Sequence, residues 1–374
     1  MYNKTFLLAF TILFILSACG GNSNQNTEPE DTGPKNELVI TSNANSFRTG
    51  DYLENSQFSV KDEAGNEVSE YEITNYDLFK QGEQEITFTT KDNKKYGTFK
   101  LTLSPRNENL KVLFVANSHA DDTLTYAYRQ VKSMSGISDD IHFVNNYKGG
   151  HDLQGYGNEG IGGLELYTFN DFNLSNPYSD PELRALSYAV EADNWDFIVL
   201  QQYTQEYHLT AQFNNIDRIC EHCLQHCSNK NVKFLFNMTF AYPDGTSLPL
   251  FQSKFDGSCD KLYDRIIDVM KNIVLPNKHI DAVIPMGTAI KNAMTSSLSV
   301  DDLFRDDGVE MRYEHLSLNY GRYIAGMAFV SFITGRPAED ITFTNNYPEK
   351  VINIAKQSVK AMNDKPFEET TINL

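Results

Sequence analysis

The stretch VLFVANSHADDT, at residues 112–123, decides the fold. Its first five residues are apolar, and a strand without polar alternation is buried on both faces, as in a parallel sheet covered by helices. Further short apolar runs follow at 141–144, 197–200, 234–236 and 282–284, and amphipathic stretches occur at 182–192, 211–227, 261–273 and 320–333. The pattern predicts a doubly wound, flavodoxin-like α/β domain with a parallel five-stranded sheet at 110–365.

The composition is that of a folded, acidic protein. The chain has 374 residues, with 32 Lys and Arg against 50 Asp and Glu, which gives a net charge of −18. Hydrophobic residues make up 40% of the chain, and its length fits about two domains, so a substantial core is expected. The sequence contains no block of basic residues, and binding to a phosphate backbone depends on clustered positive charge. We therefore expect no nucleic-acid partner.

The N-terminal region is typical of an exported, anchored protein. Lys4 precedes an apolar run at 6–16, which is too short to span a bilayer but suits a signal-peptide core. Leu16-Ser17-Ala18-Cys19 then resembles the bacterial lipobox, which implies removal of residues 1–18 and a lipid on Cys19; an ordinary signal peptide with an incidental cysteine is the alternative. Residues 19–36 are polar and predict a flexible tether. Because the residue after Cys19 is not Asp, we expect a lipid anchor in the outer membrane of a bacterial cell envelope.

Residues 37–104 alternate apolar and polar side chains in short runs. Turn signals at 64–66 and 91–93 separate these runs, and the pattern predicts a small antiparallel β-sandwich. The segments 62–68 and 81–88 resemble the turn and strand motifs of bacterial immunoglobulin-like (Ig-like) modules. We expect this module to be a spacer, with a glycan- or partner-binding module as the alternative. Residues 104–109 form a linker to the second domain.

Ser118 lies just beyond the first apolar run, at the start of a predicted helix. A hydroxyl there can point into the crevice at the sheet edge, where backbone N–H groups converge, although a serine at such a place is also a common helix N-cap. His315, near the end of the domain, can supply the base that a serine nucleophile needs, since neutral imidazole accepts a proton near pH 7. We expect Ser118 and His315 to meet at one sheet edge, with His119 and His151 lining the cleft.

The order of these loops resembles the SGNH (GDSL-like) hydrolase superfamily, whose members place a serine after the first strand and an aspartate and histidine near the end. The resemblance implies that Ser118 is the nucleophile, although the usual Gly-Asp-Ser reads Ala116-Asn117-Ser118 here. It also implies that Gly150 lends its backbone N–H to the oxyanion. The third donor is normally an Asn amide, and here the amide of Gln202 would take that place.

A narrower branch of that superfamily, catalogued as a domain of unknown function and common in envelope proteins, resembles residues 110–335 more fully. The shared motifs are Asn117-Ser118, Gly149-Gly150, Trp195-Asp196, Leu200-Gln201-Gln202, the segments 239–243 and 284–290, and His315-Leu316-Ser317. Several motifs in the right order make the resemblance more specific than any one of them. No metal or organic cofactor is implied.

The triad acid is where this chain departs from the family pattern. The family usually places Asp three residues before the histidine, but Arg312 stands there and cannot accept a hydrogen bond from the ring. Asp307, in an Asp-Gly pair slightly further upstream, is the preferred candidate. Asp306, or a Ser–His dyad held by a backbone carbonyl, are the alternatives.

Two other motifs invite different functions. Cys220, Cys223, Cys227 and two histidines cluster at 220–227, but the cysteines share the 3-4 spacing of one apolar helix face, so core packing is the preferred interpretation over a metal or redox site. One of them could pair with Cys259 in an oxidising envelope. Residues 155–160 fit G-x-G-x-x-G, yet the glycine-rich segment 148–176 shows little helical pattern, so we expect a long substrate-side loop there and no dinucleotide site.

These observations predict a serine esterase that removes acetyl or another small acyl group from a carbohydrate. Aromatic residues in the predicted strand-end loops suit the faces of sugar rings, so an acylated glycan or small acyl ester is the expected substrate. The alternative is a catalytically inactive surface lipoprotein that keeps the hydrolase fold and binds glycan, because fold membership does not secure activity.

Overall fold

The computed structural model describes residues 35–44, 46–305 and 312–374. The chain divides into two compact units, Met1–Ser104 and Pro105–Leu374, and the division falls in the linker expected from the sequence. The proposed signal peptide, Cys19 and most of the tether lie outside the described residues. Within the described ranges, no helix has both the length and the apolar character needed to cross a membrane.

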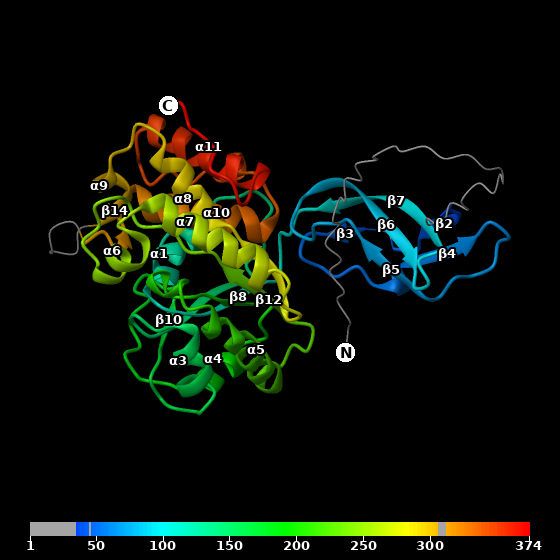
Figure 1. The fold of residues 1–374 in the computed structure, drawn as a ribbon, viewed down its shortest axis with the longest axis horizontal. Coiled ribbons are helices and arrows are strands. Elements are labelled where there is room, and N and C mark those ends of the chain that lie inside the picture. Colours follow the sequence, from blue (N-terminus) through cyan, green and yellow to red (C-terminus); the bar gives the residue numbers. More distant parts are fainter. Residues whose placement is uncertain (1–34, 45, 306–311) are drawn as a thin grey trace, which may run out of the picture. The chain divides into compact units, whose positions relative to one another are not determined.

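The first unit is built from short strands around a small apolar core (Figure 1). Its described strands are β1 (Lys35–Asn36), β2 (Leu38–Ser42), β3 (Phe47–Arg48), β4 (Phe58–Asp62), β5 (Tyr71–Thr74), β6 (Gly82–Thr90) and β7 (Lys95–Ser104), and a 3-10 turn, η1, spans Asn55–Gln57. β5, β6 and β7 pair antiparallel in one sheet, and β2 pairs antiparallel with β4 in another. The predicted alternation of buried and exposed side chains is present in β6, where Ile86 and Phe88 are fully buried and the residues between and beside them are not.

The sequence predicted a wholly antiparallel unit, and the structure differs in two short pairings. β1 and β3 are two-residue strands that pair parallel with β7 at its two ends. Strands of two residues are too short to show an alternation of apolar and polar side chains, so the sequence could not reveal them. The resemblance to an Ig-like module stays a prediction.

The second unit is a three-layer α/β domain around one six-stranded sheet (Figure 1). Its strands are β8 (Leu110–Ala116), β9 (Ile141–Tyr147), β10 (Thr168–Asp171), β11 (Phe197–Leu200), β12 (Lys233–Asn237) and β13 (Ile280–Ile284). They lie in the order β10-β9-β8-β11-β12-β13, and every neighbouring pair from β9 to β13 is parallel. This order is the doubly wound arrangement in which functional loops gather at the carboxyl ends of the strands.

The sheet has six strands where the sequence predicted five. β10 pairs antiparallel with β9, with Thr168 opposite Tyr147 and Asp171 opposite Val144. It is an edge strand with only Asn170 buried, so it carries no apolar run that could reveal it. The segment 148–176 is therefore not a plain loop, since it also contains a short helix and a π-turn. Gly157 lies in that turn, and a Cβ there would stand 2.2 Å from the side chain of Asn215, so the glycine serves close packing.

Eleven α-helices are assigned in the described residues. They are α1 (Ser118–Leu124), α2 (Ala127–Lys132), α3 (Leu153–Gly155), α4 (Leu186–Glu191), α5 (Asn215–His226), α6 (Pro249–Phe255), α7 (Cys259–Val269), α8 (Met286–Met294), α9 (Val300–Leu303), α10 (Tyr320–Thr334) and α11 (Glu349–Asp364). Shorter turns are η2 (Tyr156–Gly160), η3 (Thr204–Glu206), η4 (Thr210–Asn214), η5 (Met270–Val274) and η6 (Ala338–Asp340). The small strands β14 (Phe304–Arg305) and β15 (His315–Leu316) form a separate antiparallel pair.

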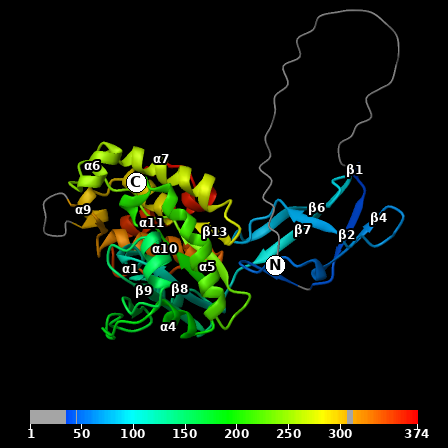
Figure 2. The same cartoon turned by 60° about the horizontal axis from the view of Figure 1, so that its bottom comes forward.

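Helix α10 is the central helix of one layer, and α11 lies beside it in both views (Figures 1 and 2). Phe329 of α10 contacts Phe114 of β8 and Phe143 of β9, with ring centroids 5.5 and 5.3 Å apart. The sequence predicted an amphipathic helix here, but α10 is buried almost throughout because α1, α2, α8 and α11 also pack on it. The domain continues past the expected end at 365, since the backbone of Thr370 and Ile372 bonds to side chains of α8 and its C-cap.

The cysteine cluster packs into the core. Cys220, Cys223, Cys227 and Cys259 are all buried free thiols. Burial raises the pKa of each thiol, which keeps the groups neutral. In the described part of the chain, no cluster of three or more His, Cys, Asp or Glu side chains could hold a metal ion.

Candidate active site

The connection from β8 to α1 places Ser118 at the carboxyl edge of the sheet. Asn117 is the N-cap of α1, and its side chain accepts a bond from the backbone N–H of His119 at 3.1 Å. The Asn117 amide also donates to the carbonyl of His151 at 2.8 Å and accepts from Gln201 at 2.9 Å. These three bonds fix the backbone on which Ser118 stands, and Ser118 itself is only partly buried.

His315 reaches the same helix from almost two hundred residues away. Its Nδ1 lies 3.2 Å from Oδ2 of Asp122, and its ring meets that of His119 edge-on at 5.4 Å between centroids. The backbone N–H of Leu316 donates to the same Asp122 oxygen at 3.0 Å. The structure therefore brings His315 to α1, the helix that begins with Ser118.

Asp122 is a site residue that the sequence reasoning missed. It follows Ser118 by four residues, so the two side chains lie on one face of the helix. It is fully buried, and Nη2 of Arg322 on α10 stands 2.7 Å from its Oδ1, at an angle outside that of a hydrogen bond. Burial alone would raise the pKa of Asp122, but Arg322 and His315 outweigh it and lower the pKa, so the carboxylate is ionised. The only signal in the sequence was the four-residue spacing from the serine.

Asp121, the neighbour of Asp122, is in a different state. Burial raises its pKa to about 7, and the amides of Asn145 and Asn170 lie 2.8 and 3.3 Å from its two oxygens. The negative charge of Asp122 raises that pKa further. The pKa values of these two adjacent carboxyls therefore shift in opposite directions, because Arg322 forms an ion pair with Asp122 and has only a minor effect on Asp121.

His119 braces the loop that carries His315. Its Nε2 lies 3.1 Å from the carbonyl of Glu314, and its Nδ1 lies 3.0 Å from the hydroxyl of Thr204. Burial, together with the charge of His315, lowers the pKa of His119 to about 4. A neutral, fully enclosed His119 is therefore a structural group of the site and not its base.

Arg312 has a role in the same loop. Its Nε lies 2.9 Å from the Glu314 carboxylate, which also accepts a bond from the hydroxyl of Tyr203. Burial would raise the pKa of Glu314, but Tyr203 and Arg312 outweigh it and lower the pKa. The residue at the family's usual Asp position thus anchors the residue next to His315. Asp306 and the preferred candidate Asp307 lie outside the described residues, and the described carboxylate at His315 is Asp122.

The two residues expected to complete the oxyanion site differ in their surroundings. Gly150 adopts a left-handed φ of 63°, is exposed, and has open space where a Cβ would stand. Gln202 is fully buried, and its amide donates to Gln212 at 2.5 Å while its carbonyl accepts from the backbone of Leu153 and Tyr203 at 3.2 and 2.8 Å. The described bonds of Gln202 therefore support the loops around the site.

The sequence matches a known family model over most of the second unit. A model described as a domain of unknown function, DUF4886, matches residues 111–363, which is most of the second unit and well over half of the chain. The chain belongs to the DUF4886 family. Curated proteins were also compared with the sequence, and none matches.

The chain is similar to several solved structures, one of them from the DUF4886 family. A crystal structure of a DUF4886 family protein from Bacteroides uniformis aligns with a TM-score of 0.61 and 23% identity, over 70% of this chain and 98% of its own. A candidate SGNH hydrolase from Slackia heliotrinireducens aligns at 0.39 and 15% identity, over 60% of this chain and 100% of its own. A carbohydrate acetylesterase from Xanthomonas citri aligns with a TM-score of 0.29 and 8% identity, over 82% of this chain and 70% of its own. The first likeness shows the fold, and the other two are too remote to carry a functional argument.

Proposed function

We propose that the DUF4886 domain of this chain is an SGNH-type serine esterase with Ser118 as nucleophile, His315 as base and Asp122 as the acid that orients the base. The contact between His315 and the ionised Asp122, one helical turn from Ser118, is the observation that carries the proposal. A base held by a carboxylate beside a hydroxyl is the arrangement that nucleophilic catalysis requires. The proposed substrate is a carbohydrate carrying acetyl or another small acyl group.

The reaction would run through an acyl-enzyme. Ser118 Oγ bonds to the acyl carbon as His315 takes its proton, and the sugar oxygen leaves with that proton. Water then attacks the acyl group, with His315 again as base, and releases the acid and free Ser118. The Ser118 and Gly150 backbone N–H groups are the proposed oxyanion donors, with Gln202 as a further donor only through its second amide hydrogen. One such donor is typically worth about 2.7–4 kcal/mol.

The arrangement at Asp122 favours catalysis over the glycan-binding alternative. That alternative depended on the absence of an acid at Arg312, and Asp122 supplies a buried, ionised carboxylate from another element. We further propose that a lipid on Cys19 attaches the protein to the outer membrane of a bacterial envelope. Mass spectrometry of the N-terminal peptide from membrane fractions tests this, since an unmodified Cys19 would contradict it.

The test of the catalytic proposal is the Ser118→Ala variant. We expect loss of 4-nitrophenyl acetate hydrolysis by at least about 10³-fold and loss of labelling by a fluorophosphonate probe. Ser253→Ala, which removes an exposed hydroxyl on α6, is the matched control and should keep both. Undiminished hydrolysis by Ser118→Ala, with an unchanged unfolding midpoint, would remove the serine from the mechanism.

A further inference from the structure

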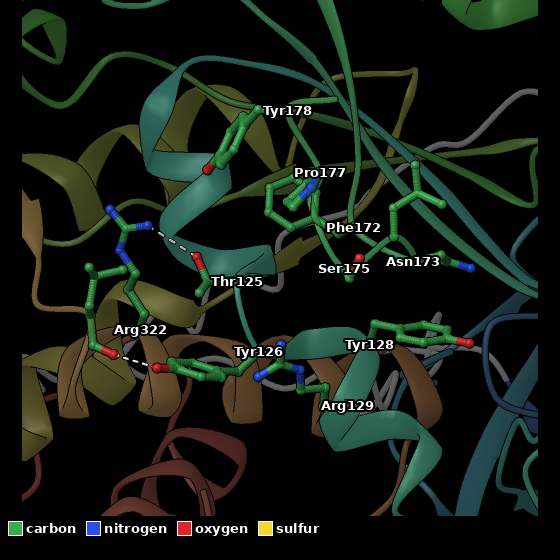
Figure 3. A pocket seen from close by; sticks show the side chains of 12 residues that line it. Thr125, Tyr126, Tyr128, Arg129, Phe172, Asn173, Ser175, Pro177, Tyr178 and Arg322 are labelled. Carbon is green, nitrogen blue, oxygen red and sulfur yellow. Dashed lines mark hydrogen bonds between the residues drawn. The ribbon is translucent and has the colours of Figure 1, made fainter. Parts of the chain in front are cut away.

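A cavity of about 480 Å³ lies beside the proposed triad, between α1–α2 and the segment 172–178 (Figure 3). It shares Arg322 with the triad, because Nη2 of that side chain pairs with Asp122 while Nη1 donates to Thr125 in the cavity wall at 3.1 Å. Leu318, three residues after His315, forms another part of the wall. The side chain of Arg322 therefore connects the cavity wall to Asp122.

The cavity is bordered by apolar side chains that are unusually exposed. Leu174, Tyr178 and Leu318 have 51, 50 and 52% of their surface exposed, and they are among the most exposed large apolar residues of the described chain. Single exposed apolar residues are ordinary, but several around one cavity are typical of a binding site. The rings of Tyr126 and Tyr128, also in the lining, add flat faces with polar edges. Such walls suit the face of a sugar ring.

The charge of the lining selects among sugars. The described lining contains two arginines, Arg129 and Arg322, and no carboxylate, although the whole chain carries a net charge of −18. Arg322 is already paired with Asp122. The contacts of residues 35–44, 46–305 and 312–374 give Arg129 no hydrogen bond or ion pair, and it is exposed. Figure 3 shows it beside Tyr126. A guanidinium left available next to tyrosine rings is suited to bind a carboxylate through two parallel bonds.

We propose that this cavity binds a sugar unit bearing a carboxylate, so that the substrate is an acylated acidic glycan. The inference deepens the proposed function and rests on it, since it names the class of carbohydrate that the esterase would accept. Arg129 would hold the carboxylate, and Tyr126, Tyr128 and Tyr178 would contact the ring.

Binding can be measured without turnover. With the full chain, isothermal titration uses tetragalacturonate, which has no acyl ester, against the neutral xylotetraose. We expect Arg129→Met to weaken tetragalacturonate binding by about 10- to 100-fold, the range for a hydrogen-bonded charge. Arg218→Met, which removes an exposed arginine on α5, is the matched control and should bind normally. The proposal would be overturned if Arg129→Met bound tetragalacturonate as tightly as the unaltered protein, or if the unaltered protein bound xylotetraose as tightly as tetragalacturonate. Tight binding of 4-hydroxybenzoate without binding of either sugar would also overturn it.

Activity on a small ester separates this inference from the proposed function. Arg129→Met should lose far more activity on acetylated polygalacturonate than on 4-nitrophenyl acetate, because the second substrate is too small to need the cavity. If Ser118-dependent hydrolysis is absent but Arg129-dependent binding is present, the esterase assignment fails and the acidic-sugar site stands. If hydrolysis is normal but Arg129 affects neither binding nor the choice of glycan, the cavity inference fails alone.

Discussion

Two histidine–carboxylate pairs lie at opposite edges of the same parallel sheet. At the carboxyl edge, His315 contacts Asp122 beside the turn that begins with Ser118. At the amino edge, His142 near the start of β9 has Asp193 at 2.8 Å from Nδ1 and Asp171 at 3.5 Å from Nε2. Both histidines are partly buried, so burial and a nearby carboxylate do not distinguish them.

What distinguishes them is the element beside each pair. The carboxyl edge is where β8 ends and α1 begins, and that turn presents a serine. The described partners of His142 are Asp171, Asp193, Phe169 and Trp195, none of which carries a hydroxyl or thiol nucleophile. With a carboxylate at each ring nitrogen, His142 belongs to a structural cluster at the amino edge. The comparison teaches that topology, more than the pair itself, indicates which histidine can catalyse.

The largest expected difference comes from removing one carboxylate at each edge. Asp122→Asn should lower kcat for 4-nitrophenyl acetate by about 10⁴-fold, because the imidazolium that forms on His315 loses its countercharge and its orientation. Asp193→Asn should leave kcat within about twofold, because the described side-chain partners of Asp193, His142 and Lys111, lie at the amino edge. Steady-state kinetics on both variants checks this.

Two outcomes would undo the comparison. Asp122 is buried beside Arg322, so the folded state of Asp122→Asn is verified by its thermal unfolding and by circular dichroism before the rates are compared. A folded Asp122→Asn with normal kcat would return the role of the acid to Asp307 or Asp306. An equal loss in Asp193→Asn would show that the amino edge also takes part in catalysis.

A smaller effect is expected from the loop that presents His315. Arg312→Gln removes the ion pair with Glu314. A charge-assisted hydrogen bond contributes about 1.5 kcal/mol. If all of this free energy serves to position His315, kcat should fall about tenfold. Because Arg312 acts by positioning, KM for the small ester should not change. Arg312→Lys should recover part of kcat, and Arg184→Gln, at another surface ion pair, should do nothing. A rise in KM without a change in kcat would mean that Arg312 contacts the substrate.

The sequence predicted the parts of the site that sit at strand ends. Buried runs locate the sheet, and a parallel sheet collects its loops at one edge, so Ser118 could be named from the end of the first run. His315 was named as the base that such a serine needs, and the catalytic roles of both residues stay predictions. The left-handed φ of Gly150 agrees with its glycine-rich loop. The sequence could not predict that the Gln202 amide donates to Gln212, because this hydrogen bond depends on how two loops fold together.

Asp122 could not be recognised in the same way. An acid in the first turns of a helix is common, since it favours the positive end of the helix dipole, and nothing local separates Asp121 from Asp122. Their difference comes from Arg322 on α10, some two hundred residues further along the chain. Likewise β10 depends on the backbone of β9 for its pairing and has little apolar character of its own.

The smallest expected effect concerns stability at the amino edge. Burial alone would lower the pKa of His142, but Asp171 and Asp193 outweigh it and raise the pKa above the unfolded value of about 6.5. A raised folded pKa means that protonated His142 stabilises the fold fully below that unfolded value, and that this contribution is lost as pH rises through the folded pKa. Asp121 also titrates near neutral pH, since burial raises its pKa to about 7, so the wild-type curve alone cannot assign the effect.

The difference in unfolding free energy between wild type and His142→Gln isolates the contribution of His142. Urea unfolding of both proteins from pH 5.5 to 8.5 should show wild type more stable than the variant at low pH, with the gap narrowing as pH rises. The site at His315 should be unaffected, so 4-nitrophenyl acetate hydrolysis by His142→Gln should follow the wild-type pH profile. A gap that stays constant across this range would show that His142 contributes by packing against Trp195 and not by its charge.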